Sequence, residues 1–267
     1  MDPESLETPN LGYVWASVST VAFITTNLLL RSVVPQSARN TKQQEWKWRN
    51  TANSFLHSVI TGIWACGCFW QSPEIRENLI SIYTESSHHL LSVSVGYFIY
   101  DLLDIGLNHR KRSSYELMVH HIVVILCFGL AVSTRYYLGY GLMALLVEMN
   151  SIFLHVRQLL LIQGVPRGHL LYRLNSLFCL GTFVVFRIAT LGWMTRWLVF
   201  VRNQLTTTAF TMGSLAMPII LVMNIVLFLR ILNADYCGKR SSRDCSYVQQ
   251  LAVEEDEGLD PAGGKDA

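Results

Sequence analysis

The chain alternates long apolar runs with short polar segments, and this pattern predicts its architecture. About 20 apolar residues in a helix cross the hydrocarbon core of a bilayer. Seven runs approach or reach that length, at residues 11–30, 54–70, 90–107, 117–134, 139–162, 174–194 and 212–232. The pattern therefore predicts an all-α fold, a polytopic membrane helix bundle with about seven transmembrane helices.

The two ends of the chain differ from the apolar runs between them. The first run follows the acidic residues Asp2, Glu4 and Glu7, whereas a secretory signal begins with a basic region. We therefore predict an uncleaved transmembrane helix; its removal or failure to insert would leave six spans. Residues 236–267 are polar and turn acidic, a composition that cannot bury a core and is typical of disorder.

Composition supports the membrane assignment independently. The chain is 51% hydrophobic and 15% charged, whereas ordinary soluble domains carry about 25% charged residues. Its formal net charge of +2 is close to neutral, so the sequence implies no nucleic-acid partner. Membrane lipids are the expected partners, and the sequence identifies no protein partner.

The distribution of basic residues predicts the orientation in the membrane. With the N-terminus outside, 16 of the 21 Lys and Arg residues fall in cytoplasmic segments, 4 fall in external segments, and Arg187 lies inside a predicted helix. Cytoplasmic loops carry the excess of Lys and Arg in membrane proteins. We therefore predict an N-terminus outside and a C-terminus in the cytoplasm.

Several predicted helices contain polar or ionisable side chains. On insertion scales a charge at a helix centre costs about 2.5–3.5 kcal/mol, so such residues are functional candidates. The candidates outside the central histidine pair are His57, Asp101, Asp104, Glu148, Asn150, His155 and Arg187. The alternative is a structural network, in which Arg187 pairs with Asp101, Asp104 or Glu148 and fixes the helix register.

The adjacent histidines His120 and His121 open the helix predicted at 117–134. Adjacent helical residues point about 100° apart, so the two rings cannot easily chelate one metal, and no second cluster has metal-ligand spacing. We predict no metal site. One ring could face the bundle interior while the other bonds a neighbour, which suits a general base or a nucleophile. The alternative is a pair of histidines at the membrane interface.

Short motifs in a fixed order resemble the TLC domain, which ceramide synthases and translocating-chain-associated membrane proteins share. The double histidine is followed by a turn near Arg135 and by a Leu-Leu-Val-Glu helix. Further matches are Trp46-Lys-Trp-Arg-Asn50, Phe55-Leu-His-Ser58, Ser94-Val-Gly-Tyr-Phe98, Leu146-Val-Glu-Met-Asn-Ser151 and Leu191-Gly-Trp-Met194. The resemblance divides the chain into an N-terminal helix and basic connector at 1–45, a TLC domain of six helices at 46–235, and a tail at 236–267.

The resemblance to ceramide synthases implies one possible activity, transfer of an acyl group from acyl-CoA to a lipid. His120 and His121 match the first half of their motif. The downstream His-Asp of that motif falls on Val147 and Glu148, and a further Asp falls on Ser151. The downstream histidine is therefore missing, and loss of a catalytic partner can remove most of an enzyme's rate enhancement.

The members of the family that the motifs match best resemble regulators of phospholipid composition rather than enzymes. That resemblance implies limited incorporation of polyunsaturated chains and control of membrane fluidity, in the plasma membrane or alternatively the endoplasmic reticulum. It implies no cofactor, with acyl-CoA as a substrate only if the protein is an enzyme. We expect a lipid-sized cavity lined by His57, Asp101, His120, His121 and Glu148. Cys237, just past the last helix, is a candidate for S-acylation.

Overall fold

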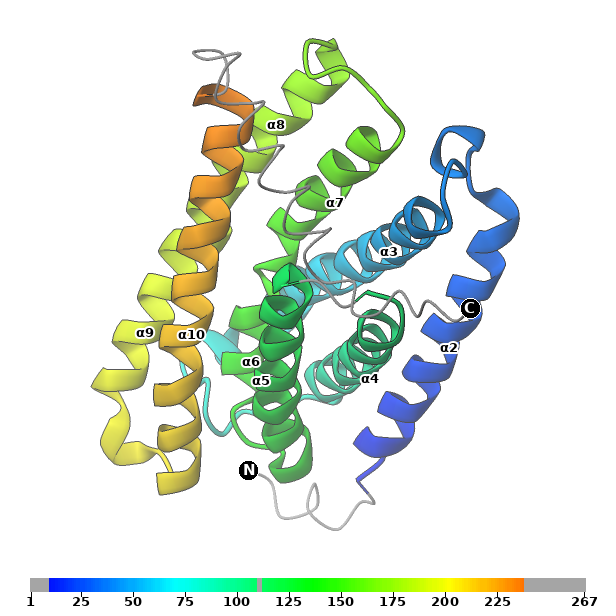
Figure 1. Cartoon of the computed structure of the whole chain (residues 1–267). Coiled ribbons are helices and arrows are strands. Elements are labelled where there is room, and N and C mark those ends of the chain that lie inside the picture. The colour runs from blue at the N-terminus through cyan, green and yellow to red at the C-terminus, as the bar shows by residue number, and fades with distance from the viewer. Residues whose placement is uncertain (1–9, 110–111, 238–267) are drawn as a thin grey trace, which may run out of the picture. The chain divides into compact units, whose positions relative to one another are not determined.

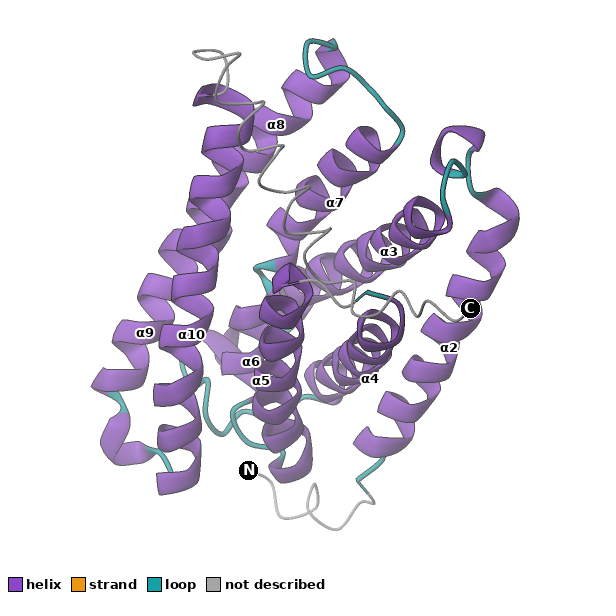
Figure 2. Ribbon diagram, viewed as in Figure 1, coloured by secondary structure: helices purple, strands orange, loops and turns teal. Residues whose placement is uncertain are grey.

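The computed structural model describes residues 10–109 and 112–237, without the side chains of residues 112, 113 and 237. Within these ranges the chain forms helices and no strand (Figure 2). The long helices are α2 Gly12–Val33, α3 Lys42–Gln71, α4 Glu85–Asn108, α5 Arg112–Thr134, α6 Leu138–Leu145, α7 Glu148–Ile162, α8 Leu170–Phe183, α9 Thr190–Phe200 and α10 Thr207–Leu232. A π-helix, η3 Val184–Ala189, joins α8 to α9, and η1 Gln36–Ala38, η2 Pro73–Arg76, η4 Arg202–Gln204 and η5 Asn233–Cys237 are short.

The helices confirm the predicted fold class. Six helical stretches in the described residues are long and apolar enough to cross a membrane: Gly12–Val33, Glu85–Asn108, Ser114–Thr134, Leu138–Ile162, Leu170–Phe200 and Thr207–Tyr236. The seventh predicted span, at 54–70, forms the second half of α3, a 30-residue helix. That helix carries too many polar residues to meet the same criterion, so its crossing of the membrane stays a prediction.

Two threonines explain why helices begin earlier than the apolar runs. Thr41 accepts a hydrogen bond from the Gln44 backbone N–H (3.1 Å), and Thr84 accepts one from the Ser87 N–H (3.2 Å). An N-cap of this kind stabilises a helix by about 1 kcal/mol. The caps therefore support polar first turns in α3 and α4, which hydropathy does not show.

The chain divides into two compact units, residues 1–224 and 225–267. The described part of the second unit holds the end of α10 and η5. The cavity, the groove and the polar groups around them lie within the first unit, in which α4 packs against α2, α3, α5 and α6 (Figure 1).

Close packing of α2 on α4 requires a glycine. A Cβ atom added to Gly96 of α4 would lie 2.2 Å from the Ala16 carbonyl oxygen of α2. At this approach Ser19 donates to the Val93 carbonyl at 2.7 Å, and Thr20 donates to the Gly96 carbonyl at 2.9 Å. The N-terminal helix is thus integrated into the bundle through α4.

Two predicted helices contain interruptions. The run at 139–162 divides into α6 and α7 with a break at residues 146–147, so that Glu148 becomes the first residue of α7. The run at 174–194 passes through η3, which contains Arg187. Both interruptions fall next to polar residues inside the bundle.

The orientation stays a prediction that antibody accessibility tests. An N-terminal tag should stain on intact cells, and a C-terminal tag should stain only after permeabilisation. The reason is that 16 of the 21 Lys and Arg residues fall in segments predicted to lie on the cytoplasmic side of the membrane, together with the C-terminus. Staining of both tags on intact cells would contradict this topology.

Candidate functional site

A buried carboxylate–imidazole pair links α4 and α5. The Nε2 atom of His121 lies 2.6 Å from Oδ2 of Asp101, and both side chains are about 95% buried. The other ring nitrogen of His121, Nδ1, is buried without a hydrogen-bond partner. Asp101 therefore fixes the orientation of the His121 ring.

A series of side-chain hydrogen bonds links this pair to α3. Asn50 donates to Oδ1 of Asp101 (2.6 Å) and also to Oδ2 of Asp104 (3.0 Å). The indole N–H of Trp46 donates to the same Asp104 oxygen (3.0 Å). Asp104 thus belongs to the hydrogen-bond network of α3 and α4 and helps to hold Asp101 in place.

His57 of α3 is sequestered among aromatic rings. It stacks on Tyr97 with ring centroids 3.7 Å apart and is 1% exposed. Its Nε2 atom is buried without a hydrogen-bond partner. Phe98 packs edge-on against both His57 and His121, with centroid distances of 5.3 Å in each case.

An interior cavity of about 120 Å³ is lined in part by Phe98. Most of its lining is apolar, contributed by α4, α5, α6, α9 and α10. Its polar lining residues are His120, Tyr137, Tyr140, Glu148, Arg187 and Asn224. The cavity can therefore accept hydrocarbon along most of its wall and a polar or charged group beside those residues.

Arg187 holds its place in the cavity wall through neutral oxygens. Its Nε donates to Asn150 Oδ1 (2.8 Å), Nη1 to Asn224 Oδ1 (2.7 Å) and Nη2 to Ser151 Oγ (2.8 Å). No carboxylate lies within ion-pair distance of it in the part of the chain that the structure describes. The expected pairing with Asp101, Asp104 or Glu148 is therefore wrong, because amide and hydroxyl dipoles solvate the guanidinium instead.

Asn150 and Glu148 place α7 against its neighbours. Asn150 is fully buried and donates to the Cys179 carbonyl (2.8 Å) and to Thr182 Oγ1 (2.9 Å) while accepting from Arg187. Glu148 accepts a hydrogen bond from Ser58 of α3 at 2.6 Å. Glu148 thus joins the cavity to α3, and Asn150 joins Arg187 to α8.

The expectation of a single polar cavity needs correction, because the candidates separate into two groups. His120, Glu148 and Arg187 line the cavity, and Asn150 supports Arg187 from behind. His57, Asp101, Asp104 and His121 lie outside the cavity lining, whereas Phe98, which packs against His57 and His121, contributes to it. His155 is half-buried on α7 and also lies outside the lining.

The site contains polar partners that periodicity did not single out, chiefly Ser58, Ser151 and Asn224. They are small residues inside apolar runs, and their only sequence signal is a polar side chain at membrane depth. No group of three His, Cys, Asp or Glu residues is arranged to hold a metal ion within 10–109 and 112–237. The Cys237 side chain lies outside what the structure describes, so its acylation stays a prediction.

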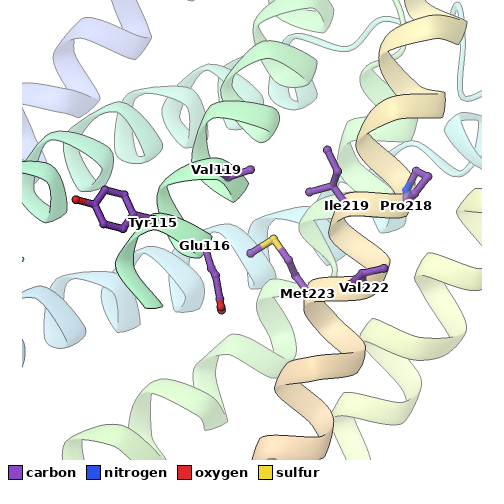
Figure 3. Close-up of a pocket in the computed structure, with 7 residues that line it drawn as sticks. All are labelled: Tyr115, Glu116, Val119, Pro218, Ile219, Val222 and Met223. Atoms are coloured by element: carbon purple, nitrogen blue, oxygen red, sulfur yellow. The ribbon is translucent and has the colours of Figure 1, made fainter. Parts of the chain in front are cut away.

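A surface groove of about 650 Å³ runs between α5 and α10. It is lined by Tyr115, Glu116, Val119, Pro218, Ile219, Val222 and Met223. Figure 3 shows Val119 and Met223 directed into the space between the two helices. Val119 precedes the cavity residue His120, and Met223 precedes Asn224, so the groove and the cavity lie along the same stretches of α5 and α10.

Comparison with known proteins identifies the family. The model of the TLC domain matches residues 47–233. TLC domain-containing protein 2 of Danio rerio is 46% identical over 223 residues, covering 84% of this chain and 88% of the relative. TLC domain-containing protein 1 of Homo sapiens is 35% identical over 209 residues, covering 78% and 83%. Human TLC domain-containing protein 2 is 32% identical over 230 residues, covering 86% of each chain.

These matches confirm the resemblance that the double histidine and the ordered short motifs indicated. They also support a multi-pass membrane protein with a role related to membrane lipids. The chain belongs to the TLC domain family.

Proposed function

We propose that this protein regulates the phospholipid composition of its membrane by holding part of a lipid acyl chain inside the helix bundle. The observation that carries the proposal is the interior cavity, apolar along most of its wall and polar beside His120, Glu148 and Arg187. An apolar chain gains about 25 cal/mol for each Å² of surface that it removes from water. Within a membrane that gain is absent, so shape and the polar end must select the occupant.

The size of the cavity limits what it can hold. Sites for whole small molecules usually measure about 300–1,000 Å³, whereas this cavity measures about 120 Å³. It therefore suits a short segment of one chain rather than a complete phospholipid. A narrow site also discriminates between straight chains and chains bent by several cis double bonds, which supports selection against polyunsaturated chains.

The groove between α5 and α10 provides a surface on which the rest of the chain can lie. Its lining is apolar except for Tyr115 and Glu116, and it faces the helices that also enclose the cavity. The family resemblance favours the plasma membrane as the location, with the endoplasmic reticulum as the alternative.

A lipid profile tests this proposal. Removal of the protein from cells should raise the fraction of polyunsaturated chains in their phospholipids, and re-expression of the intact chain should restore it. The measurement is mass spectrometry of total membrane phospholipids. An unchanged chain distribution across loss and re-expression would refute the regulatory role.

Acyl transfer is the second candidate, and the Asp101–His121 pair is the observation that favours it. In such a reaction a histidine would take the proton from an acceptor amine or hydroxyl, whose lone pair attacks the thioester carbonyl of acyl-CoA. The C–S bond would then break, and the histidine would return the proton to the sulfur, which releases the CoA thiol. His121 Nε2 is engaged by Asp101, whereas His120 lines the cavity. In this second candidate function we assign the proton-accepting role to His120.

Replacement of both His120 and His121 by Ala separates the two functions. We expect the purified wild-type chain to transfer no labelled acyl group from acyl-CoA to lipid amines or hydroxyls, because Val147 stands where ceramide synthases carry a histidine. The double variant should then change the lipid profile only as far as it disturbs packing, as His57→Ala also would. Wild-type transfer that the double variant lacks, at equal protein amount and location, would establish the enzyme instead.

A further inference from the structure

The proposed function leaves unexplained a guanidinium at the centre of the bundle that has no carboxylate within ion-pair distance among the described residues. Arg187 lies near the middle of the apolar stretch Leu170–Phe200. Its three hydrogen-bond acceptors are the side chains of Asn150, Ser151 and Asn224, all neutral. Side chains with full charges at this depth are usually paired with an opposite charge. Glu148 lines the same cavity, but no described carboxylate lies within ion-pair distance of Arg187.

The guanidinium also has donors to spare. It carries five N–H groups, and its three nitrogens each donate one hydrogen bond to a described residue. Two N–H groups, one on Nη1 and one on Nη2, remain available. Two such N–H groups can bind both oxygens of a carboxylate or two oxygens of a phosphate.

The backbone at Arg187 supports a role in binding. Residues Val184–Ala189 form a π-helix inside an otherwise α-helical stretch. Single π-turns of this kind are rare and occur frequently at functional sites. A purely structural arginine that only bridges α7 and α10 does not require the wider turn.

The cavity beside Arg187 is open to a ligand rather than filled by protein. Arg187, His120 and Asn224 contribute to its wall together with apolar side chains such as Phe128 and Met217. One end of the occupant must therefore suit a cation, and the remainder must be hydrocarbon.

We propose that Arg187 binds the oxyanion of a single-chain lipid, a carboxylate or a phosphate at the end of a hydrocarbon chain, inside this cavity. This inference rests on the proposed function, because it assumes that an acyl chain occupies the cavity. It specifies which end of the lipid is recognised and by which group.

Glu148 carries the opposite charge to Arg187 and provides a comparison within the same cavity. Its carboxylate lines the same cavity and accepts a hydrogen bond from Ser58. A negative charge there opposes a second anion in the cavity. Removal of that charge should therefore strengthen anion binding, whereas removal of the Arg187 charge should weaken it.

The test compares three probes on the purified full-length chain in nanodiscs of phosphatidylcholine. The probes are hexadecanoate, hexadecanol and 1-hexadecanoyl-lysophosphatidic acid, each measured by competition against a photoreactive fatty acid. A charge-assisted hydrogen bond contributes about 1.5–3 kcal/mol, so at least one anionic probe should bind about tenfold or more tightly than hexadecanol. The preferred anion, carboxylate or phosphate, identifies the source of the oxyanion.

Two variants assign the preference to a residue. Arg187→Gln should bind the anion and hexadecanol equally tightly. Glu148→Gln should preserve or increase the preference for the anion over hexadecanol. Equal binding of all three probes by the wild-type chain would overturn the inference. This outcome does not depend on whether the variants fold. A preference that persists in Arg187→Gln would overturn it as well.

Failure of the proposed function has a different outcome. In that case neither the anions nor hexadecanol would compete with the photoreactive probe. Competition by hexadecanol without preference for an anion would keep acyl-chain binding and reject only the role of Arg187.

Discussion

Filling the interior cavity should abolish the effect of this protein on phospholipid composition without unfolding it. Ala144 of α6 lines the cavity, and Ala144→Leu adds three carbon atoms to its wall. Overpacking a filled core costs about 1–3 kcal/mol, whereas filling a cavity commonly stabilises a protein. We therefore expect Ala144→Leu to melt no lower than wild type in detergent while cells expressing it show the phospholipid profile of cells without the protein.

The matched control is the same change on the surface of the bundle. Ala22 of α2 is exposed, so Ala22→Leu adds the same three carbons without reaching the cavity. This control should restore the phospholipid profile as fully as wild type. If Ala144→Leu and Ala22→Leu behave alike, the cavity has no part in the function.

The second large effect concerns the Asp101–His121 pair. Removal of one partner of a buried hydrogen bond leaves the other group unsatisfied, which costs about 1–3 kcal/mol and more for a charged group. Asp101→Ala strands the His121 ring and removes an acceptor from Asn50. The free energy of unfolding of Asp101→Ala should therefore fall by about 2 kcal/mol or more, measured by reversible denaturation in detergent.

A double-mutant cycle identifies the pair as the cause. After His121→Ala, the additional loss from Asp101→Ala should be smaller by at least about 1 kcal/mol, since contacting residues couple by about 0.5–3 kcal/mol. Glu85→Ala is the control, because this exposed carboxylate lies 3.8 Å from His89 in a surface pair and such pairs contribute about 0–1 kcal/mol. Additive losses at Asp101 and His121 would show that the two side chains do not interact.

The sequence predicted the helices well because their cause is local. Apolar runs of membrane-spanning length predicted the helices from α2 to α10, and the polar turn near Arg135 appears where two residues, Arg135 and Tyr137, have positive φ. The predicted helix boundaries were less accurate than the predicted helices themselves. Thr84 caps α4 at Glu85, five residues before the predicted start at 90, and a cap depends on a single side chain rather than on an apolar run.

The site could be predicted only in part, because its partners lie far apart in the chain. Hydropathy identified Asp101, His121, Glu148 and Arg187 as costly at membrane depth. It could not show that Asp101 and His121 bond to each other, 20 residues apart, while Arg187 is solvated by amides rather than carboxylates. That choice depends on how α7 and α10 face η3, which helix periodicity does not determine.

The sequence also could not predict which histidine of the pair lines the cavity. His120 and His121 are adjacent, yet only His120 lines the cavity, while His121 turns toward Asp101. Their divergence follows from the helical repeat of 3.6 residues per turn. Which ring faces the cavity depends on the rotation of α5 about its axis, and only tertiary packing sets that rotation.

Photolabelling with a phospholipid whose acyl chain carries a diazirine tests acyl-chain binding most directly. In nanodiscs the label should attach to cavity residues such as Cys127, Tyr140 and Met217, and Ala144→Leu should suppress these adducts. Adducts confined to surface residues such as Trp70 and Phe200, which are 86% and 85% exposed, and unchanged by Ala144→Leu, would contradict a chain inside the bundle.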